Sequence, residues 1–425
     1  MEAAPQCIAA INNVPVSLQD SIRELRRRPG FSDLILLILT SSPEKYSKKR
    51  FLSPQVRVVP CDFDSPESIS AAIAPYYGAL LGVVYRGEKY IQDLRRLIPF
   101  LPQSILVSSA DSLQAATNKY LMRTAFTRSY PQITPQFVEI HDDTDRTVEE
   151  VEAHVQYPVI VKPANLATSL MISACHSRDE LRPTLTKIFR EIHDVYRSEG
   201  RRDKPQVIVE EYLEGDFYSI DAYVMEPGRV YHCPPVAYTP MKQLKVDDFA
   251  VYKRSVPTEL SADEVMAAQE VVTKAITAVG LTYTTVHAEL VLTASGWKVI
   301  EIGPRVGKFR TDIYKWAYGI DHSMNDVFIH LGQKPIIPSR QRAYCAAYSI
   351  WPKREGTLMT IKGLEYVRIS PLTRFLQIKA APGDQCLYAK HCGHALAEFV
   401  IAGPDKRAFD ELVSFIETDV EAVVT

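Results

Sequence analysis

One β-hairpin restricts the fold of this chain more than any other stretch. Residues 286–302 read as two apolar strands joined by a turn of three small residues. A turn centred on the middle one pairs Val291 with Val299 and places Glu289 directly opposite Glu301. Facing residues on paired strands lie roughly 5 Å apart, so the two carboxylates repel each other. Unpaired carboxylates are costly on a half-buried sheet. The pattern therefore predicts either a cation between them or a hairpin at a solvent-exposed edge.

A divalent metal ion satisfies the first of these alternatives. Mg²⁺, or Mn²⁺ in its place, prefers carboxylate and phosphate oxygens as ligands. Arg305 follows the hairpin and supplies a fixed positive group for an anion. His287 pairs with Gly303 across the hairpin and so shares the glutamate face. It either lines this site or is a hydrogen-bonded core histidine.

Lysines supply the second set of candidates. Lys162 lies near the end of the apolar run 158–163, and an isolated buried ammonium is costly. Its side chain therefore either extends to solvent from the strand end or lies near an anion. Lys119 lies upstream in a helical pattern. Lys253-Arg254 either reach the anion near Lys162 or form an ordinary basic pair in a loop. Two lysines and a pair of carboxylates are the parts that hold a nucleoside triphosphate and its magnesium.

Composition and charge argue against two classes of partner. Lys and Arg number 49 against 51 Asp and Glu, so the net charge of -2 gives no basic field for nucleic acid or anionic membrane. The longest apolar run, 34–39, is too short to cross a bilayer, and the first thirty residues lack a signal-peptide pattern. Seven scattered cysteines without Cys-x-x-Cys are typical of free thiols in a reducing compartment. We therefore expect a cytoplasmic protein with no nucleic-acid or membrane partner.

The order of strands and helices predicts an α/β protein. Residues 8–110 alternate β-rich runs, the last at 104–109, with helices, as in a parallel sheet covered on both faces. The first strand is not followed by Gly-x-Gly-x-x-Gly, so the dinucleotide-binding fingerprint is missing. Residues 340–425 read as a small closing α/β subdomain. The expected helices are at 17–28, 66–75, 88–98, 178–198 and 261–279, and the expected strands before the hairpin include 158–163, 206–213 and 218–225.

The candidate residues form an ordered set: Lys119, Lys162, the run Val-Glu-Glu-Tyr-Leu-Glu-Gly at 209–215, the paired glutamates and Arg305. This set resembles the pattern of the ATP-grasp superfamily. Within it, the chain is similar to the carboxylate-amine ligases, including L-amino acid ligases and carnosine-synthase-like enzymes. The resemblance implies an α/β chain with an α+β catalytic part. Its implied parts are a Rossmann-like domain at 1–114, an ATP-grasp domain at 115–335 with a lid subdomain at about 120–205, and a small C-terminal α/β subdomain at 336–425.

The resemblance also implies a role for each residue of the set. Lys119 and Lys162 would contact ATP phosphates, the two glutamates would hold Mg²⁺ or Mn²⁺, and Arg305 would bind the substrate carboxylate or its acyl phosphate. The other residues implied to bind ATP are Glu210, Glu211, Tyr212 and Leu213 around adenine, Thr168 and Ser169 in the phosphate-covering loop, and Asp216 near the ribose. Those implied near the substrates are Glu88, His287, Gly303 and Phe309.

Four features depart from the family pattern, one of them Lys308 in place of part of a familiar Gly-Gly pair. The phosphate-covering loop, 164–173, contains no glycine. Phe217 stands where many relatives carry a ribose-binding glutamate, and Gly303 stands where the common motif has an asparagine. A nucleotide-binding protein without catalysis is the alternative that these departures support.

The reaction implied is ATP-dependent formation of an amide or peptide bond between a small carboxylic or amino acid and an amine. It proceeds through an acyl phosphate and releases ADP and phosphate. A biotin-carboxylase-like carboxylation is the alternative that keeps the fold and changes the acceptor. Apolar surfaces on the N-terminal domain would suit a homodimer.

Overall fold

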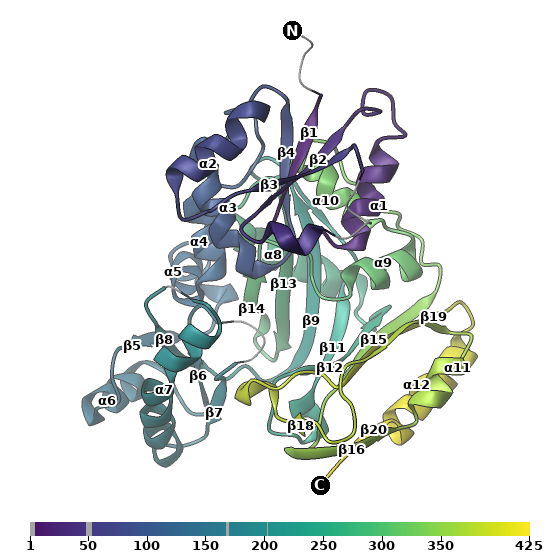
Figure 1. Ribbon diagram of the computed structural model, residues 1–425. Helices are drawn as coiled ribbons and strands as arrows, with labels where there is room; N and C mark the ends of the chain where they lie inside the picture. Colours follow the sequence, from purple (N-terminus) through teal and green to yellow (C-terminus); the bar gives the residue numbers. More distant parts are fainter. Residues whose placement is uncertain (1–4, 48–52, 167–169, 202) are drawn as a thin grey trace.

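The computed structural model describes residues 5–47, 53–166, 170–201 and 203–425. Four sheets organise these residues: a parallel sheet near the N-terminus, a lid sheet, a long central sheet and a small C-terminal sheet (Figure 1). All seven cysteines are free thiols, and six of them are buried, as the sequence predicts. Within the described ranges, no helix is long and apolar enough to cross a membrane.

The N-terminal sheet is parallel and carries helices on both faces, which confirms the prediction. Its order is β3-β2-β1-β4, and alternate residues of β1 enter two different cores. Cys7, Ala9 and Ile11 pack on the side of α2 and α3, whereas Ile8 and Ala10 pack against α1 and the distant α10. The strands are β1 (Cys7–Ile11), β2 (Ile35–Thr40), β3 (Val56–Pro60) and β4 (Leu80–Tyr85), and the helices are α1 (Val16–Leu25), α2 (Pro66–Ile73), α3 (Ile91–Leu97) and α10 (His322–His330).

The strand expected at 104–109 is wrong. These residues form a loop that leads into α4 (Ala110–Thr117). The Ser108 hydroxyl donates to the Thr282 carbonyl, and the Ser109 side chain accepts the Ser112 amide as the helix N-cap. Side-chain hydrogen bonds of this kind compete with strand pairing, so the serines end the extended run.

The lid sheet is antiparallel, in the order β5-β8-β6-β7. Lys162 of β6 pairs with Ile208 of β8, so its side chain shares a face with that of Glu210, two residues further along β8. The lid elements are α5 (Lys119–Ser129), β5 (Phe137–Ile140), α6 (Asp145–His154), β6 (Val159–Pro163), β7 (Ser173–Cys175), α7 (Arg178–Ser198) and β8 (Val207–Glu211).

The central sheet runs β14-β13-β9-β11-β12-β15-β19-β17, with β10 paired to β9. The capping box of Ser261 and Glu264 begins α8 (Ala262–Val279), and Gly280 ends it in the left-handed conformation. The strands are β9 (Asp216–Val224), β10 (Val230–His232), β11 (Val236–Pro240), β12 (Val251–Val256), β13 (Thr284–Thr293), β14 (Gly296–Gly303), β15 (Tyr344–Ile350), β17 (Thr373–Ile378) and β19 (Ala397–Gly403).

The C-terminal residues share the central sheet. Strands β15, β19 and β17 extend it, so 336–425 do not pack around an entirely separate sheet. The small sheet β18-β16-β20 and two helices complete this part, at the lower right of Figure 1. They are β16 (Gly356–Lys362), β18 (Gln385–Cys386), β20 (Glu421–Val424), α11 (Leu364–Ile369) and α12 (Lys406–Asp419).

The hairpin of β13 and β14 places Glu289 opposite Glu301, as predicted, and His287 opposite Gly303. The pairing of Val291 with Val299 is wrong, because Val291 pairs with Lys298.

A β-bulge explains the one-residue error. The turn is tighter than expected, since Thr293 pairs directly with Gly296. This shifts the register near the turn, and Ile300 is the extra residue that restores it before Glu301. The bulge thus keeps the two glutamates in register.

Candidate functional site

A cavity of about 1150 Å³ lies between the lid sheet, the central sheet and the C-terminal residues. Most of the predicted site residues contribute to its wall. Those that line it are Lys119, Lys162, Glu210, Glu211, Tyr212, Leu213, His287, Glu289, Glu301 and Arg305. Residues separated by almost two hundred positions in the sequence therefore meet around one space.

The facing carboxylates of the hairpin each have a cationic neighbour. Glu301 Oε2 lies 3.2 Å from Lys119 Nζ, and Glu289 Oε1 lies 3.3 Å from His287 Nε2. Both glutamate side chains are 26% exposed, so they are accessible from the cavity. Burial alone would raise the pKa of Glu289, but His287, Arg305 and Arg254 outweigh it and lower that pKa. Glu289 is therefore ionised at neutral pH.

The pair fits a metal ion that takes part of its coordination from a ligand. In the described part of the chain, no three His, Cys, Asp or Glu side chains come together as a complete metal site. Two carboxylates leave most positions around a hard divalent cation for phosphate or water oxygens. Magnesium in nucleotide sites is commonly held in this way, by one or two carboxylates and the phosphates.

Lys119 and Lys162 are both buried and approach the cavity from different elements. Lys119 is the first residue of α5, where the Asn118 side chain caps the helix. Its Nζ donates to the Leu166 carbonyl over 2.8 Å. Lys162 is only 5% exposed, so it does not extend to solvent; its Nζ lies 2.6 Å from Glu210 Oε2.

Glu210 is the anion between Lys162 and a second buried cation, Arg123. Burial would raise the pKa of Glu210, but Arg123 and Lys162 lower it to about 2. Burial lowers the pKa of Lys162 to about 8, and Glu210 only partly opposes this. The Glu210 carboxylate is thus fully engaged within the protein. Sequence reasoning missed Arg123, although it lies four residues after Lys119 in a helical pattern, on the same helix face.

Arg305 joins the hairpin to the N-terminal domain. Its Nε lies 3.1 Å from Glu88 Oε2, which brings together two residues that the sequence places 217 positions apart. Burial acts to lower the pKa of Arg305, but Glu88, Glu301 and Glu289 raise it above the ordinary value. The guanidinium is a permanent cation beside the paired glutamates.

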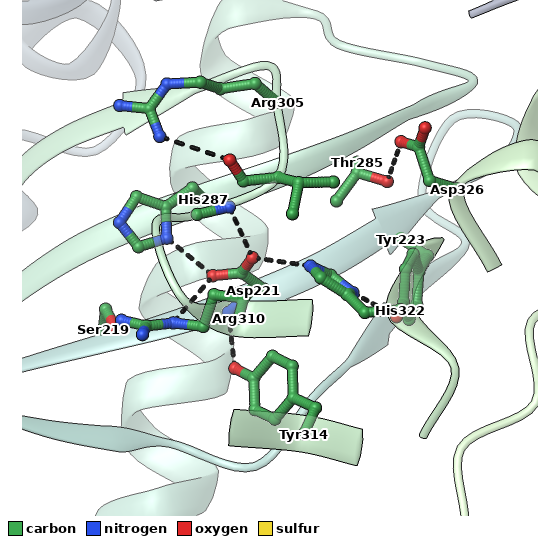
Figure 2. A network of polar contacts seen from close by, with 12 residues as sticks. Ser219, Asp221, Tyr223, Thr285, His287, Arg305, Arg310, Tyr314, His322 and Asp326 are labelled. Carbon is green, nitrogen blue, oxygen red and sulfur yellow. Dashed lines mark hydrogen bonds and ion pairs between the residues drawn. The ribbon is translucent and has the colours of Figure 1, made fainter. Parts of the chain in front are cut away.

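A buried network centred on Asp221 holds His287, the neighbour of Glu289; Figure 2 shows the contacts around Asp221. Asp221 Oδ1 lies 2.6 Å from His287 Nδ1, and Asp221 Oδ2 lies 2.9 Å from His322 Nε2. The Gly307 amide also donates to Asp221, over 3.0 Å. Burial alone would lower the pKa of His287, but Tyr238, Asp221 and Glu289 raise it to about 10. His287 is therefore an imidazolium that orients Glu289. No local pattern pointed to Asp221, which sequence reasoning missed.

The residues predicted to bind adenine and ribose are only partly brought to the cavity. Glu211, Tyr212 and Leu213 line the cavity next to Phe217. Asp216 is exposed and is not part of the lining. Thr168 and Ser169 lie outside the described residues.

Two further candidates take supporting positions. Gly303 is buried, and a Cβ there would lie 3.6 Å from the Arg305 side chain. Phe309 begins α9 (Arg310–Tyr318) and lies under the Arg254 guanidinium, 5.5 Å from the ring centroid. The largest group that sequence reasoning missed is the segment 379–398, which forms much of the opposite wall of the cavity.

Comparison with known proteins agrees with this geometry. The family model described as "ATP-grasp domain" matches residues 155–312. The D-alanine--D-alanine ligase of Enterococcus faecalis is 30% identical over 172 residues, which is 39% of this chain and 45% of that protein. The uncharacterized protein y4rH of Sinorhizobium fredii is 23% identical over 281 residues, 64% of this chain and 54% of that protein. The matches thus span about half the length of these relatives.

The fold as a whole resembles a solved ligase. The crystal structure of L-amino acid ligase from Bacillus licheniformis superposes with a TM-score of 0.73 over 100% of both chains, at 19% sequence identity. At this identity the likeness establishes the α/β fold.

Proposed function

We propose that this chain, in which residues 155–312 form an ATP-grasp domain, is an ATP-dependent ligase that joins a carboxylate to an amine. The observation that carries the proposal is the pairing of Glu289 with Glu301 on the cavity wall. Two like charges so placed favour a bound cation, and Lys162 and Arg305 in the same wall favour its anionic partner. A magnesium nucleotide has both charges.

Glu289 and Glu301 are proposed to hold Mg²⁺ or Mn²⁺, with Lys119 and Lys162 on the phosphates. The metal would neutralise phosphate charge and polarise the transferred phosphoryl group. Adenine binding is assigned to Glu211, Tyr212 and Leu213. Glu210 positions Lys162 through their ion pair. Thr168, Ser169 and Asp216 are assigned to phosphate and ribose contacts.

The reaction proposed has two steps. A carboxylate oxygen of the first substrate bonds to the γ-phosphorus, and the bond from that phosphorus to the bridging oxygen breaks, with ADP leaving. The amine nitrogen of the second substrate then bonds to the acyl carbon. Phosphate leaves with the electrons of the acyl C–O bond, and the nitrogen loses a proton to solvent. Arg305 would stabilise the charge on the reacting carboxylate and on the acyl phosphate.

An acyl phosphate is hydrolysed readily, so the site must exclude water. The lid at about 120–205 and the segment 379–398 both line the cavity, and they meet where the Met171 amide donates to the Lys390 carbonyl over 3.3 Å. We assign the water-excluding role to these two parts. We also propose domain limits at 1–114, 115–335 and 336–425, and assembly as a homodimer. Glu88 and His287 are proposed to lie beside the substrates.

ADP release tests the proposal. The protein is incubated with ATP and Mg²⁺, and with pooled amino acids, bicarbonate or no addition. A ligase releases ADP only with amino acids, and mass spectrometry identifies the amide product. Release that needs bicarbonate would indicate a carboxylase, and nucleotide binding without release would indicate a binding protein. Glu301→Gln is the inactive variant, and Glu191→Gln, on the exposed surface of α7, is its matched control.

A further inference from the structure

A buried arginine without an acid partner lies on the central sheet. Arg254 of β12 is 7% exposed. Within the described ranges, its Nη1 donates to the Val251 carbonyl at 3.3 Å and to Ser349 Oγ at 3.5 Å, and its Nε has no hydrogen-bond partner. Among the described residues, no carboxylate forms an ion pair with it. The charge of Glu289 acts on this guanidinium from a distance, and a buried charge without a direct opposite partner is costly, so an anion bound beside Arg254 would be stabilised.

Aromatic rings fix the position of this arginine. The guanidinium carbon lies 5.4 Å from the Tyr238 ring centroid and 5.5 Å from that of Phe309. The Lys308 ammonium lies 5.2 Å from the same Phe309 ring. Cation–π contacts stabilise a cation without neutralising it. Arg254 and Lys308 therefore approach one ring and keep their charges.

Lys308 belongs to a second cluster with excess positive charge. Glu398 lies 2.5 Å from Lys308 Nζ and 2.6 Å from Lys379 Nζ, so one carboxylate serves two ammonium groups. Its side chain is 7% exposed, whereas those of Lys308 and Lys379 are 49% and 36% exposed. All of these residues line the cavity. Asp384, the other acid nearby, accepts the Ala381 amide over 2.8 Å.

The cluster is separate from the metal pair. Glu289 is on β13 and Arg254 on β12, with β9 and β11 between them. The two strands are roughly 14 Å apart across the sheet, but the Arg254 side chain acts on Glu289 and helps to lower its pKa. Glu398 is on β19, two strands beyond β12, so an anion bound between Lys308 and Lys379 is a different group from one held between the two glutamates.

We propose that Arg254, Lys308 and Lys379 bind a carboxylate or phosphate group carried by one of the two substrates, in addition to the carboxylate that reacts. The inference rests on the proposed ligase function and narrows its substrate class. One substrate carries a second anionic group, and the cluster selects against neutral analogues of it. The segment 379–398 contributes to specificity through Lys379.

Thermal unfolding in the presence of Mg²⁺ and a non-hydrolysable ATP analogue tests this inference. The probes are three matched pairs: glutamate and glutamine, O-phosphoserine and serine, and O-phosphoethanolamine and ethanolamine. We expect at least one anionic member to raise Tm, and its neutral partner to have little effect. The carboxylate and phosphate pairs distinguish the two kinds of anion.

Three variants separate a binding role from a structural one. Lys308→Met combined with Lys379→Met removes the Tm shift caused by the anion and keeps the shift caused by the nucleotide. Glu398→Gln releases both lysines, so the same probe binds at least several-fold more tightly. Lys353→Met alters a comparable Lys–Glu pair that does not line the cavity, and it leaves every shift unchanged.

The inference is overturned if no anionic probe shifts Tm in the wild-type protein, if neutral partners act equally, or if the double variant keeps the shift. Loss of the nucleotide shift in the wild-type protein would instead contradict the proposed function, so the two failures are distinguishable.

Discussion

Arg123 holds Glu210 through two hydrogen bonds, of 2.8 Å and 3.2 Å, in a region where neither residue is more than 3% exposed. The same guanidinium donates to the carbonyls of Val299 and Ile300, next to Glu301. One buried arginine therefore connects the lid strand β8 with the hairpin that carries the paired glutamates. The ion pair is a structural link between the proposed nucleotide and metal sites.

Glu210→Gln is expected to destabilise the protein by about 3–5 kcal/mol, because it leaves two buried cations without their anion. Urea unfolding at pH 7 measures the change in the free energy of unfolding. Glu191→Gln, which removes an exposed ion pair, should cost about 0.5 kcal/mol or less. Equal effects of the two variants would contradict the buried link.

Acid pH tests the same pair without mutation. The pKa of Glu210 in the folded protein is about 2, below its ordinary 4.5. A lowered carboxyl pKa contributes stability that is fully present above the ordinary value and is lost as pH falls through the folded value. Stability should therefore fall between pH 4.5 and pH 2 more steeply in the wild-type protein than in Glu210→Gln. If the stability of the two proteins falls in parallel over this pH range, Glu210 does not contribute to the acid dependence of stability.

Nucleotide affinity is expected to decrease as pH rises through about 8. Burial lowers the pKa of Lys162 to about 8 in the free protein, and the phosphates favour its charged form. Calorimetric titration with Mg–ADP between pH 7 and 9.5 should show Kd rising by up to about tenfold per pH unit above 8. Lys162→Arg remains charged in this range, so it should lose the pH dependence. A flat wild-type profile would exclude Lys162 from phosphate binding.

Arg305→Lys keeps the positive charge and loses the planar guanidinium. If Arg305 stabilises the reacting carboxylate and the acyl phosphate, substrate-dependent ADP release should fall about 100-fold. Affinity for Mg–ADP should change little. Unchanged turnover in the lysine variant would remove Arg305 from the chemical step.

Gly307→Ala tests the network behind Glu289. A Cβ at this position would lie 2.4 Å from His287 Nδ1 and 2.8 Å from Arg310 Cγ, so the ring or the loop must move. We expect a loss of about 1–3 kcal/mol of stability and a higher Mg²⁺ concentration for half-maximal activity. Gly78→Ala is the control, since no atom lies within 4 Å of its Cβ position. Normal metal dependence in Gly307→Ala would mean that the network does not position Glu289.

Periodicity predicted the parts of the site that lie within single strands. A turn centred on Ser295 placed Glu289 opposite Glu301, and the order of elements placed Lys162 on a lid strand. The tighter turn and the compensating bulge could not be read from that pattern, because the wider turn without a bulge and the tighter turn with one give the same pairing of the glutamates.

Long-range partners account for most of what was missed. Arg123 and Glu210 are 87 positions apart, and His287 and Asp221 are 66 apart. Neither pairing follows from local pattern, since the first depends on how α5 packs against β8 and the second on the pairing of β9 with β13. The segment 379–398 was missed for the same reason: strands β15, β19 and β17 bring it to the cavity by extending the central sheet.

A crystal grown with Mn²⁺ and a non-hydrolysable ATP analogue tests the central claim most directly. Anomalous scattering locates the metal. The account predicts a peak about 2 Å from carboxylate oxygens of both Glu289 and Glu301, with the phosphates on its other side. A bound nucleotide with no peak there, and with both carboxylates turned to solvent, would contradict it.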